Sequence, residues 1–479
     1  MQENDTRSEP SERLEVAYTD KPVSGWGGLV AMVRFFDKRG VRELLGRALP
    51  DGRTSPNQIP VIDLVLSFLV SVLTGARRFA HVERLRADEA VRGILGVERL
   101  PSAMSVTRYF GGFVRQQVEH LDEVLWSFTM QWLRAPMLGM TLDLDSTVFE
   151  RYGAQEGSLK GHNPRKHGRP SHHPILAMLA EPKVVVHAWL RSGNSSSARG
   201  VVAFLDEALA RLGEGFRLYG LRADSGFYIA EFLTALEARD LPYAIVVRMT
   251  RDVQRAVAVI PKWTSFAPGL EVGEMQYQAP GWKHARRIVV VREEILERPE
   301  ARGRKLIHLP GYTFHTVVTT LALSAADVWR FYNARADCEN RLKELKEDFA
   351  ANGFCLQSFD GTEVAFRLIC FLFNLVAAFK REVIANESPR LMTLRTDVLV
   401  VGAVLGADGR KPVLRLGLRD KFRDHFAALL ARVASLASTV AQFANPANQK
   451  DSPTPTSWHP RRRRTPAGTG AGVARLAPS

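Results

Sequence analysis

The chain has 479 residues, of which 46% are hydrophobic and 24% charged, so it has room for several domains and a large buried core. Its 65 Lys and Arg residues outnumber 51 Asp and Glu residues. The resulting formal charge of +14 favours a polyanionic partner such as nucleic acid over a merely soluble basic protein. Three cysteines are too few for a disulfide framework, and no apolar run reaches the roughly 20 residues of a membrane helix, which excludes a secreted scaffold and a membrane protein.

The first part of the chain is predicted to be a disordered start followed by a helical region. Residues 1–22 are polar and contain no apolar signal-peptide core, which favours a cytoplasmic location. Residues 23–134 have apolar positions three and four apart and breaks at proline, which predicts helices, and the basic clusters on them lead us to expect a DNA-recognition region. Arginines including Arg77 and Arg78 cluster here. Residues 101–110 are similar to the turn of a helix-turn-helix module, although a plain helical bundle fits equally well.

From residue 135 onward the pattern changes to that of a mixed α/β sheet. Apolar, β-branched stretches predict strands, and helical periodicity predicts helices between them. The strands are expected at residues 137–148, 183–190, 218–222 and 243–248, and the helices at 199–212 and 230–239. This order indicates an α/β catalytic core over 135–249 and 316–385. Short β-like segments punctuated by Gly and Pro predict a β-rich insertion over 250–315.

The last third of the chain is predicted to be helical and to end in a basic tail. One helix begins after Ser324, whose spacing to Asp327 suits a capping box, and a buried helix follows around residues 368–379. A helical region is expected over 386–450. The tail at 451–479 is rich in Gly, Pro and Ala and is predicted to be disordered; its arginines would at most add non-specific affinity for DNA.

The helix after Ser324 combines an acid with cations on one face. At about 100° per residue, four polar side chains fall within an arc of roughly 60°: Tyr332, Arg335, Glu339 and Lys346. An apolar stripe runs beside them from Phe331 to Phe349 at spacings of 3 and 4. The helix can therefore pack on a core while it presents a carboxylate among phosphate-binding groups. A solvated face with Glu339 paired to Lys343 is the alternative.

Further acids lie at the ends of two predicted strands. Asp143 and Asp145 share one face of the first strand, and Asp224 follows a later strand directly. Ligands of α/β sheets bind at such strand ends, although a lone Asp there is often only a turn-forming cap. Three carboxylates from two strands and a helix suit a pair of Mg²⁺ ions, because this ion prefers hard oxygen ligands.

Two short motifs and one spaced signature resemble those of bacterial insertion-sequence transposases. The short motifs are Asp145-Ser-Thr and RADSGF at residues 222–227, and the signature is Tyr-x2-Arg-x3-Glu-x6-Lys from Tyr332 to Lys346. The chain is similar to the insertion-sequence-four superfamily over roughly residues 135–380, and residues 161–174 (GHNPRKHGRPSHHP) resemble its thirteen-eighty group.

The resemblance implies a ribonuclease-H-like core with a β insertion between the second Asp and the Glu. The implied catalytic metal ligands are Asp145, Asp224 and Glu339, and the implied contacts to the DNA backbone are Tyr332, Arg335 and Lys346. The metal would be two Mg²⁺ ions, for which Mn²⁺ can substitute. Asp143 leaves the choice of the first ligand open, and Asp145 is favoured because Ser-Thr follows it as in the family motif.

Two other groups of residues have competing interpretations. The segment that contains His162, His167, His172 and His173 lacks cysteine or acid partners, so a zinc site is disfavoured. A loop that follows DNA phosphates through Arg165, Lys166 and Arg169 is the preferred interpretation. Trp263 and Trp282 are interpreted as structural residues of the insertion, and stacking on a flipped base is the alternative.

The sequence therefore predicts a DNA transposase that uses a cut-and-paste route. Its partner would be double-stranded DNA, namely the terminal inverted repeats of the element and the target DNA. The protein would bind this DNA as a homodimer, and no membrane partner is expected. One alternative is a ribonuclease-H-like nuclease that never joins strands. The other is a non-catalytic DNA-binding protein or repressor derived from a transposase, which the presence of all three acids disfavours.

Overall fold

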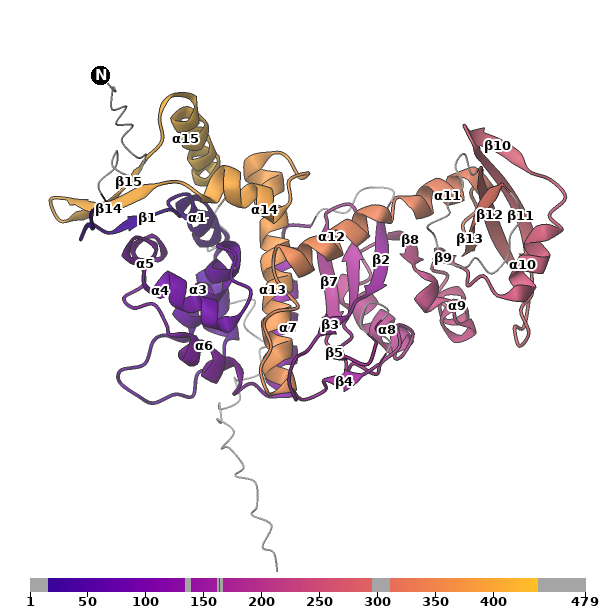
Figure 1. Ribbon diagram of the computed structural model, residues 1–479, viewed down its shortest axis with the longest axis horizontal. Helices are drawn as coiled ribbons and strands as arrows, with labels where there is room; N and C mark the ends of the chain where they lie inside the picture. The colour runs from indigo at the N-terminus through magenta and orange to yellow at the C-terminus, as the bar shows by residue number, and fades with distance from the viewer. Residues whose placement is uncertain (1–15, 134–138, 162, 164–166, 295–310, 438–479) are drawn as a thin grey trace, which may run out of the picture.

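The computed structural model describes residues 16–133, 139–161, 163, 167–294 and 311–437. A helical part, a central sheet and an extension of that sheet lie in a row, so the molecule is elongated (Figure 1). The predicted tail at 451–479, most of the predicted disordered start at 1–22, and the basic residues Arg165 and Lys166 lie outside the described residues.

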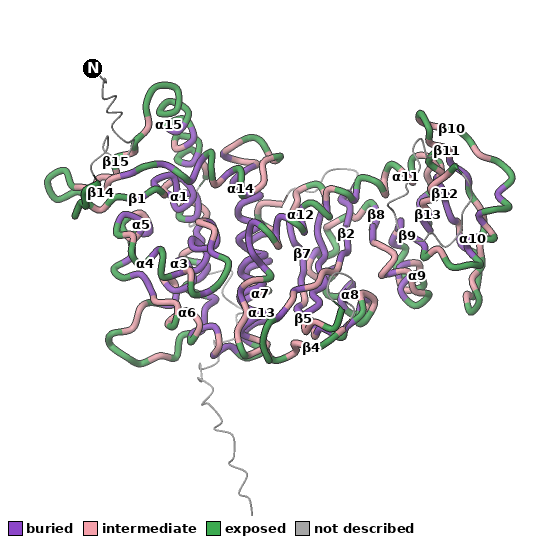
Figure 2. The backbone as a smooth tube through the Cα atoms, in the orientation of Figure 1, coloured by how far each residue is buried: buried purple, intermediate pink, exposed green. Residues whose placement is uncertain are grey.

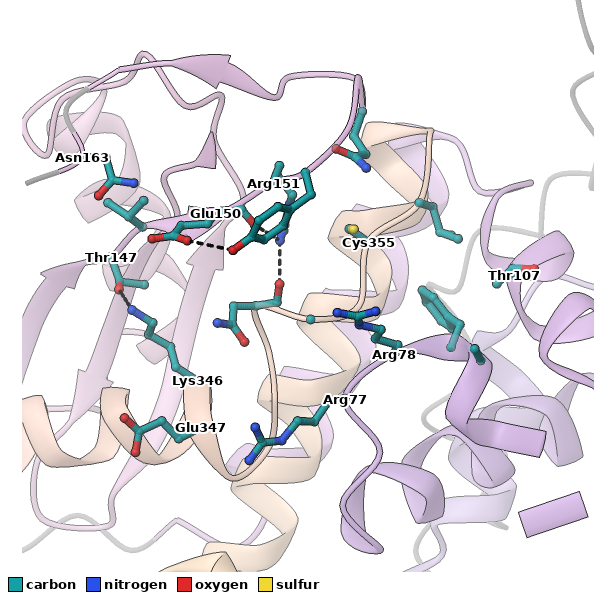
Figure 3. A pocket seen from close by; sticks show the side chains of 18 of the residues that line it. Arg77, Arg78, Thr107, Thr147, Glu150, Arg151, Asn163, Lys346, Glu347 and Cys355 are labelled. Atoms are coloured by element: carbon teal, nitrogen blue, oxygen red, sulfur yellow. Dashed lines mark hydrogen bonds between the residues drawn. The ribbon is translucent and has the colours of Figure 1, made fainter. Parts of the chain in front are cut away.

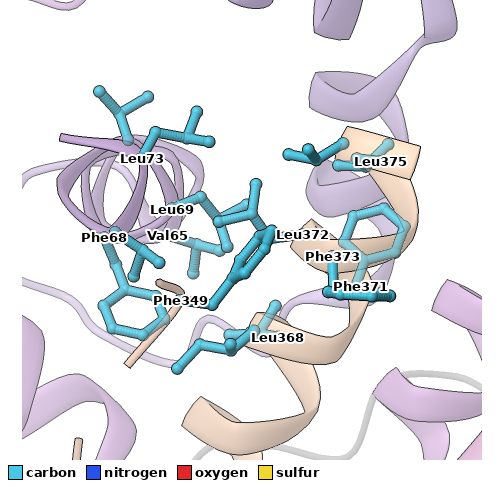
Figure 4. Close-up of a cluster of buried hydrophobic side chains, with 14 of the residues drawn as sticks. Val65, Phe68, Leu69, Leu73, Phe349, Leu368, Phe371, Leu372, Phe373 and Leu375 are labelled. Atoms are coloured by element: carbon cyan, nitrogen blue, oxygen red, sulfur yellow. The ribbon is translucent and has the colours of Figure 1, made fainter. Parts of the chain in front are cut away.

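The described N-terminal part is helical, because its apolar residues recur three and four positions apart. Its helices are α1 (Leu29–Arg39), α2 (Val41–Ala48), α3 (Val61–Leu73), α4 (Val82–Arg86), α5 (Glu89–Leu95), α6 (Ala103–Phe110) and α7 (Arg115–Met130). Helices α3, α6 and α7 contact the long helix α13 (Phe359–Phe379). Figure 4 shows α3 and α13 meeting through Leu69 and Leu372, with Phe349 beside them. The helical part is therefore continuous with the packing of the core.

The central sheet has the ribonuclease-H-like order. Its five core strands are β2 (Met140–Ser146), β6 (Ile175–Leu179), β7 (Val184–Trp189), β8 (Leu218–Ala223) and β9 (Tyr243–Val246). They lie side by side as β7-β6-β2-β8-β9; β2, β6 and β7 are antiparallel neighbours, whereas β8 and β9 run parallel to β2. The predicted strands and the mixed α/β fold class are confirmed, and β6 is an additional strand.

Both faces of these core strands are covered, which is why their sequences are almost continuously apolar. On β2, Leu142 and Leu144 belong to the core beneath α8 (Val201–Leu212) and α9 (Ala230–Glu237). On β6, Met178 faces the opposite side, where its sulfur contacts that of Cys338 on α12 (Ala336–Glu347). Alternation along β2 therefore directs Asp143 and Asp145 toward the α12 face.

The insertion continues the core sheet. It comprises α10 (Arg251–Ala258), β10 (Thr264–Ala267), β11 (Leu270–Tyr277), β12 (Arg286–Glu294) and β13 (Tyr312–Thr319). Because β13 pairs with β9 through partners such as Val317 and Val246, all nine strands form one sheet. The predicted boundary at 315/316 falls inside β13. Because β13 pairs with β9, the insertion extends the core sheet.

The helix predicted after Ser324 is two helices. Ser324 caps α11 (Ala325–Asn333) by accepting a hydrogen bond from the Asp327 amide, as expected. The chain then makes a tighter turn, in which the Arg335 amide donates to the Tyr332 carbonyl, before α12 begins. Tyr332 therefore lies on α11, whereas Glu339 and Lys346 lie on α12, and the prediction of one uninterrupted helix was wrong.

Helix α13 runs through the middle of the molecule. The segment Phe359–Ile384 is long and apolar enough to cross a membrane by composition, yet its most apolar window is wholly buried within the fold. Figure 2 shows that α13 is buried along most of its length. A core helix is the structural role that this burial indicates.

The C-terminal region departs from the helical prediction for 386–450. After α14 (Leu391–Leu394), strands β14 (Ala403–Asp408) and β15 (Lys411–Leu416) form a hairpin, and α15 (Asp420–Ser435) follows. The hairpin turns at Gly409, which has a φ of 59°, and β14 pairs with β1 (Val23–Ser24) near the other end of the chain. An Asp-Gly turn between apolar runs was the overlooked signal.

Candidate active site

Strand order brings two of the predicted acids to one edge of the sheet. Asp145 is the penultimate residue of β2, and Asp224 follows the last residue of β8. The two strands are parallel neighbours in which Leu144 lies opposite Ala223, so the two carboxylates leave the sheet side by side. The Asp224 side chain also accepts a hydrogen bond of 2.8 Å from the Gly226 amide, which fixes the turn after β8.

The guanidinium of Arg335 joins the third acid to this edge. Its Nη2 lies 3.0 Å from Oδ2 of Asp145, and its Nη1 donates to Oε1 of Glu339 at 2.7 Å. Arg335 is 2% exposed, whereas Glu339 is exposed and Asp224 half-buried. The structure thus brings Asp145, Asp224, Arg335 and Glu339 together as one group with an open side, here called the acid cluster.

The acid cluster carries more negative than positive charge. Burial raises the pKa of Asp145 to about 6; Arg335 opposes this shift, and the neighbouring Asp224 and Glu339 add to it. Burial alone would lower the pKa of Arg335, but the charges of Asp145 and Tyr332 outweigh burial and raise it. Three carboxyl groups therefore share one guanidinium, and ionised Asp145 is under-compensated.

The chemistry of this donor set fits a divalent cation. Carboxylate oxygens are the ligands that Mg²⁺ and Mn²⁺ prefer, and a divalent charge would compensate the excess of negative charge. Within the described part of the chain, no group of three or more acid, imidazole or thiol side chains is close enough together to hold a metal ion. In this cluster, the guanidinium of Arg335 lies between Asp145 and Glu339.

Asp143 has a different environment from Asp145. Its two carboxylate oxygens accept hydrogen bonds of 2.6 and 2.8 Å from Arg222, and it is 1% exposed. Arg222 also donates to the Phe331 carbonyl at 2.8 Å, and its guanidinium lies over the Phe331 ring. Asp143 is therefore part of a buried ion pair that connects β2, β8 and α11.

The predicted DNA contacts differ in how accessible they are. Lys346 is half-buried, and its Nζ donates to Oγ1 of Thr147, two residues after Asp145, at 3.0 Å. Tyr332 is also half-buried, and burial raises the pKa of its phenol. The buried Arg335, by contrast, contacts the acids themselves, so it is placed to organise carboxylates more directly than to bind a DNA phosphate.

The histidine segment is structural where it is described. His172 lies on β5 (Pro170–His172), which forms a small sheet with β3 (Phe149–Glu150) and β4 (Leu159–Lys160). Its Nδ1 accepts a hydrogen bond of 2.9 Å from Arg151, and burial lowers the pKa of His172 to about 4. Arg169 lies over the exposed ring of Tyr152, with its guanidinium 4.6 Å from the ring centroid. His162 lies outside the described residues, together with Arg165 and Lys166.

Both insertion tryptophans are half-buried and packed by arginines. The guanidinium of Arg292 lies 4.4 Å from the Trp263 ring centroid, and that of Arg286 lies 4.5 Å from the Trp282 ring centroid. Arg286 in turn forms an ion pair with Glu237 on α9. These contacts fit the interpretation of both rings as structural residues of the insertion.

Two residues near the site were not singled out from the sequence. Arg222 had a sequence signal, because it is a basic residue two positions before Asp224 at the end of a predicted strand. In the structure it lies opposite Asp143 on the neighbouring strand. Ser197, whose Oγ lies 2.7 Å from that of Ser146 beside the acid cluster, has no such signal. Its position depends on the loop after β7, which local patterns do not specify.

Five core strands in this order, with acids at the ends of β2 and β8 and on α12, define a ribonuclease-H-like core. The family described as "Transposase DDE domain group 1" matches residues 7–438, and the chain belongs to this family. Members of this family generally use divalent metal ions.

Comparison with other proteins adds two findings. A solved structure described as "Cryo-EM structure of piggyBac transposase synaptic complex with hairpin DNA" is similar to the chain with a TM-score of 0.43 and 10% sequence identity. The match covers 91% of this chain and 89% of that one. No curated protein matches the chain.

Proposed function

We propose that the chain is a DNA transposase of the insertion-sequence-four superfamily, thirteen-eighty group, that excises its element and inserts it into target DNA. The observation that carries this proposal is the convergence of Asp145, Asp224 and Glu339 around one guanidinium at the carboxyl edge of the sheet. Family membership and the +14 charge support a DNA substrate. The protein would act in the bacterial cytoplasm, as a homodimer that holds both element ends.

Asp145, Asp224 and Glu339 would hold two Mg²⁺ ions, for which Mn²⁺ can substitute. When bound, such ions activate the attacking oxygen and stabilise the leaving oxygen of a phosphodiester. We assign the first ligand to Asp145, because both oxygens of Asp143 are already bonded to Arg222. Arg335 would hold Asp145 and Glu339 in register before DNA arrives.

The reaction would proceed in two types of step. In cleavage, water attacks phosphorus at the element end, the bond to the 3′ oxygen breaks, and a 3′-hydroxyl and a 5′-phosphate result. In joining, that 3′-hydroxyl attacks another phosphodiester and displaces its 3′ oxygen, first on the opposite strand to give a hairpin and, after reopening, on the target. Lys346 and Thr147, which are hydrogen-bonded to each other, would orient the phosphate, and this hydrogen bond two residues after Asp145 supports that role.

A strand-transfer assay tests this proposal against its alternatives. The purified protein is incubated with Mg²⁺, a duplex that carries the inverted repeats bracketing its gene, and a supercoiled target plasmid. Joined products support a transposase, cleavage without joining indicates a nuclease, and binding without cleavage indicates a repressor. Normal cleavage by Asp145→Asn together with loss of cleavage in Asp143→Asn would overturn the metal assignment.

A further inference from the structure

A cleft of about 960 Å³ lies between the helical part and the catalytic core (Figure 3). One wall is the loop that contains Arg77 and Arg78, between α3 and α4. The opposite wall is the segment from Ser146 to Tyr152, and Lys346 also lines the cleft. Because Ser146 directly follows Asp145, this cleft opens beside the acid cluster.

The free cationic groups of this cleft are Arg77 and Arg78. Both are exposed, and among the described residues neither guanidinium has an ion-pair partner. Other cations lie near them: burial lowers the pKa of Arg395 and Arg77 adds to that shift, and burial lowers the pKa of His81 with further contributions from Arg84, Arg78 and Arg77. Gathering like charges is unfavourable unless an anion binds between them.

The acids of the cleft have partners of their own. Glu347 lies 3.2 Å from Arg390, outside the cleft lining. The Glu150 carboxylate accepts a hydrogen bond from the Tyr152 hydroxyl at 3.4 Å. Buried Arg151 is likewise engaged, because it donates to His172 and to the Asn352 carbonyl. The lining as a whole holds more cations (Arg77, Arg78, Arg151 and Lys346) than acids (Glu150 and Glu347), so an incoming ligand meets a net positive charge.

Packing holds this loop in a fixed position. The ring centroids of Phe79 and Phe354 are 5.3 Å apart, and Phe68 of α3 packs on both rings. Behind the loop, a Cβ built on Gly353 would lie 2.1 Å from the Arg77 carbonyl oxygen, so this approach of two backbones requires glycine. The backbone that carries the two arginines is therefore fixed before a ligand binds, which lowers the ordering cost of binding.

We propose that this cleft binds the phosphodiester backbone of the DNA strand that leads into the acid cluster, with Arg77 and Arg78 on its phosphates. The inference rests on the proposed function for the identity of the polyanion. DNA fits better than a small anion because the cleft is large, is lined by residues of both the helical part and the catalytic core, and reaches Ser146, the residue next to Asp145. Neither arginine belongs to the acid cluster or to the family signature in α11 and α12.

Cys355 offers a probe inside the cleft. It lines the cleft and is half-buried, whereas Cys338 and Cys370 are buried, so mild alkylation should report on Cys355. The probe ligand is a fluorescein-labelled 30-base-pair duplex of arbitrary sequence in EDTA, which prevents cleavage. At a duplex concentration ten times the Kd, mass action predicts about tenfold slower alkylation of Cys355 by N-ethylmaleimide, measured by peptide mass spectrometry.

The variant Arg77→Ala/Arg78→Ala should also weaken the salt dependence of binding. The slope of log K against log salt is expected to fall by about 2, because each lost phosphate contact removes about 0.9. The control Arg84→Ala/Arg86→Ala removes the same charge from exposed positions outside the cleft lining and should change the slope by less than half as much. Melting curves verify that both variants fold.

Several results would overturn the inference. One is tight DNA binding without protection of Cys355 from alkylation. Another is an equal loss of the slope of log K against log salt in both double variants. A third is full protection of Cys355 by millimolar inorganic phosphate while the duplex gives none. Protection by duplex in a protein that fails to cleave element ends with Mg²⁺ would refute the proposed function alone. Cleavage and joining without protection of Cys355 would refute this inference alone.

Discussion

Two clusters of charged side chains in this protein differ in their balance of sign. In the α7–α13 cluster, Arg367 contacts both Asp122 and Glu363, and Arg211 is a second cation on Asp122. Each acid there has two basic partners, since Arg115 also contacts Glu363. In the acid cluster, three carboxyl groups share Arg335 alone.

The two clusters shift acid pKa values in opposite directions. Burial alone would raise the pKa of Asp122, but Arg367 and Arg211 outweigh burial and lower it. Burial raises the pKa of Asp145 to about 6. The single guanidinium of Arg335 does not offset the combined effect of burial and the neighbouring acids. The first balance suits a cluster that holds helices together, and the second suits a site that awaits a cation and a phosphate.

Neutralising an acid of the acid cluster should have the largest effect. Asp145→Asn should lower the rate of DNA cleavage about a thousandfold or more, the scale of losing a principal charge-stabilising group. Without divalent metal at pH 8, it should also raise the free energy of unfolding by roughly 2 kcal/mol, because the ionised carboxylate is disfavoured there. Gel assays and urea denaturation measure the two effects.

Asp224→Asn and Glu339→Gln serve as companion variants, and both should lose cleavage. A cleavage rate of Asp145→Asn within tenfold of that of the wild type would contradict the assignment of the site.

Removing one partner from the α7–α13 cluster should lower stability and leave DNA cleavage almost unchanged. Arg367→Met leaves Asp122 and Glu363 buried without their shared cation, and such a loss typically costs about 3–5 kcal/mol of unfolding free energy. DNA cleavage per folded molecule should stay close to normal at low temperature. Arg222→Met is the matched test beside the acid cluster, since it leaves Asp143 buried without its cationic partner. Stability unchanged in both variants would show that these pairs do not hold the fold.

The pH dependence of stability should separate the clusters. Burial lowers the pKa of His187, which lies beside Asp122, from 6.5 to about 4. Between these values the unfolded chain binds the extra proton, so stability is complete above pH 6.5 and falls by up to roughly 3 kcal/mol toward pH 4. Asp145 works against this trend, because its protonation below about pH 6 relieves the acid cluster.

Denaturation midpoints measured across this range, with His187→Gln as the comparison, test the assignment. His187→Gln should have a flatter acid limb than the wild type. An identical acid limb would mean that other groups dominate.

Removing metal should give the smallest effect. At Mg²⁺ concentrations several times the Kd, binding to the native state alone should add about 1 kcal/mol, and EDTA should abolish it. Asp145→Asn should lose this gain, whereas Arg367→Met should retain it, as thermal melts with and without Mg²⁺ would show. Equal gains in both variants would place the cation elsewhere.

Local patterns in the sequence anticipated much of the fold and of the candidate site. Alternation on β2 placed Asp143 and Asp145 on one face, and the spacing from Ser324 to Asp327 marked the start of α11. The motif around Asp224 lay at the end of a strand, as expected. These features depend on residues a few positions apart, which is the range over which helical and strand periodicity acts.

The remaining features depend on contacts between residues far apart in the chain. The pairing of β14 with β1, the joining of the insertion to the core through β13 and β9, and the approach of Gly353 to Arg77 all have this origin. The different ion-pair partners of Asp143 and Asp145 on β2 have the same origin. Alternation in the sequence predicts that both carboxylates share one face of β2. That this face lies under α12, and that Arg222 pairs with Asp143 while Asp145 meets Arg335 and two further acids, follows from the tertiary fold, because those partners come from other strands and helices.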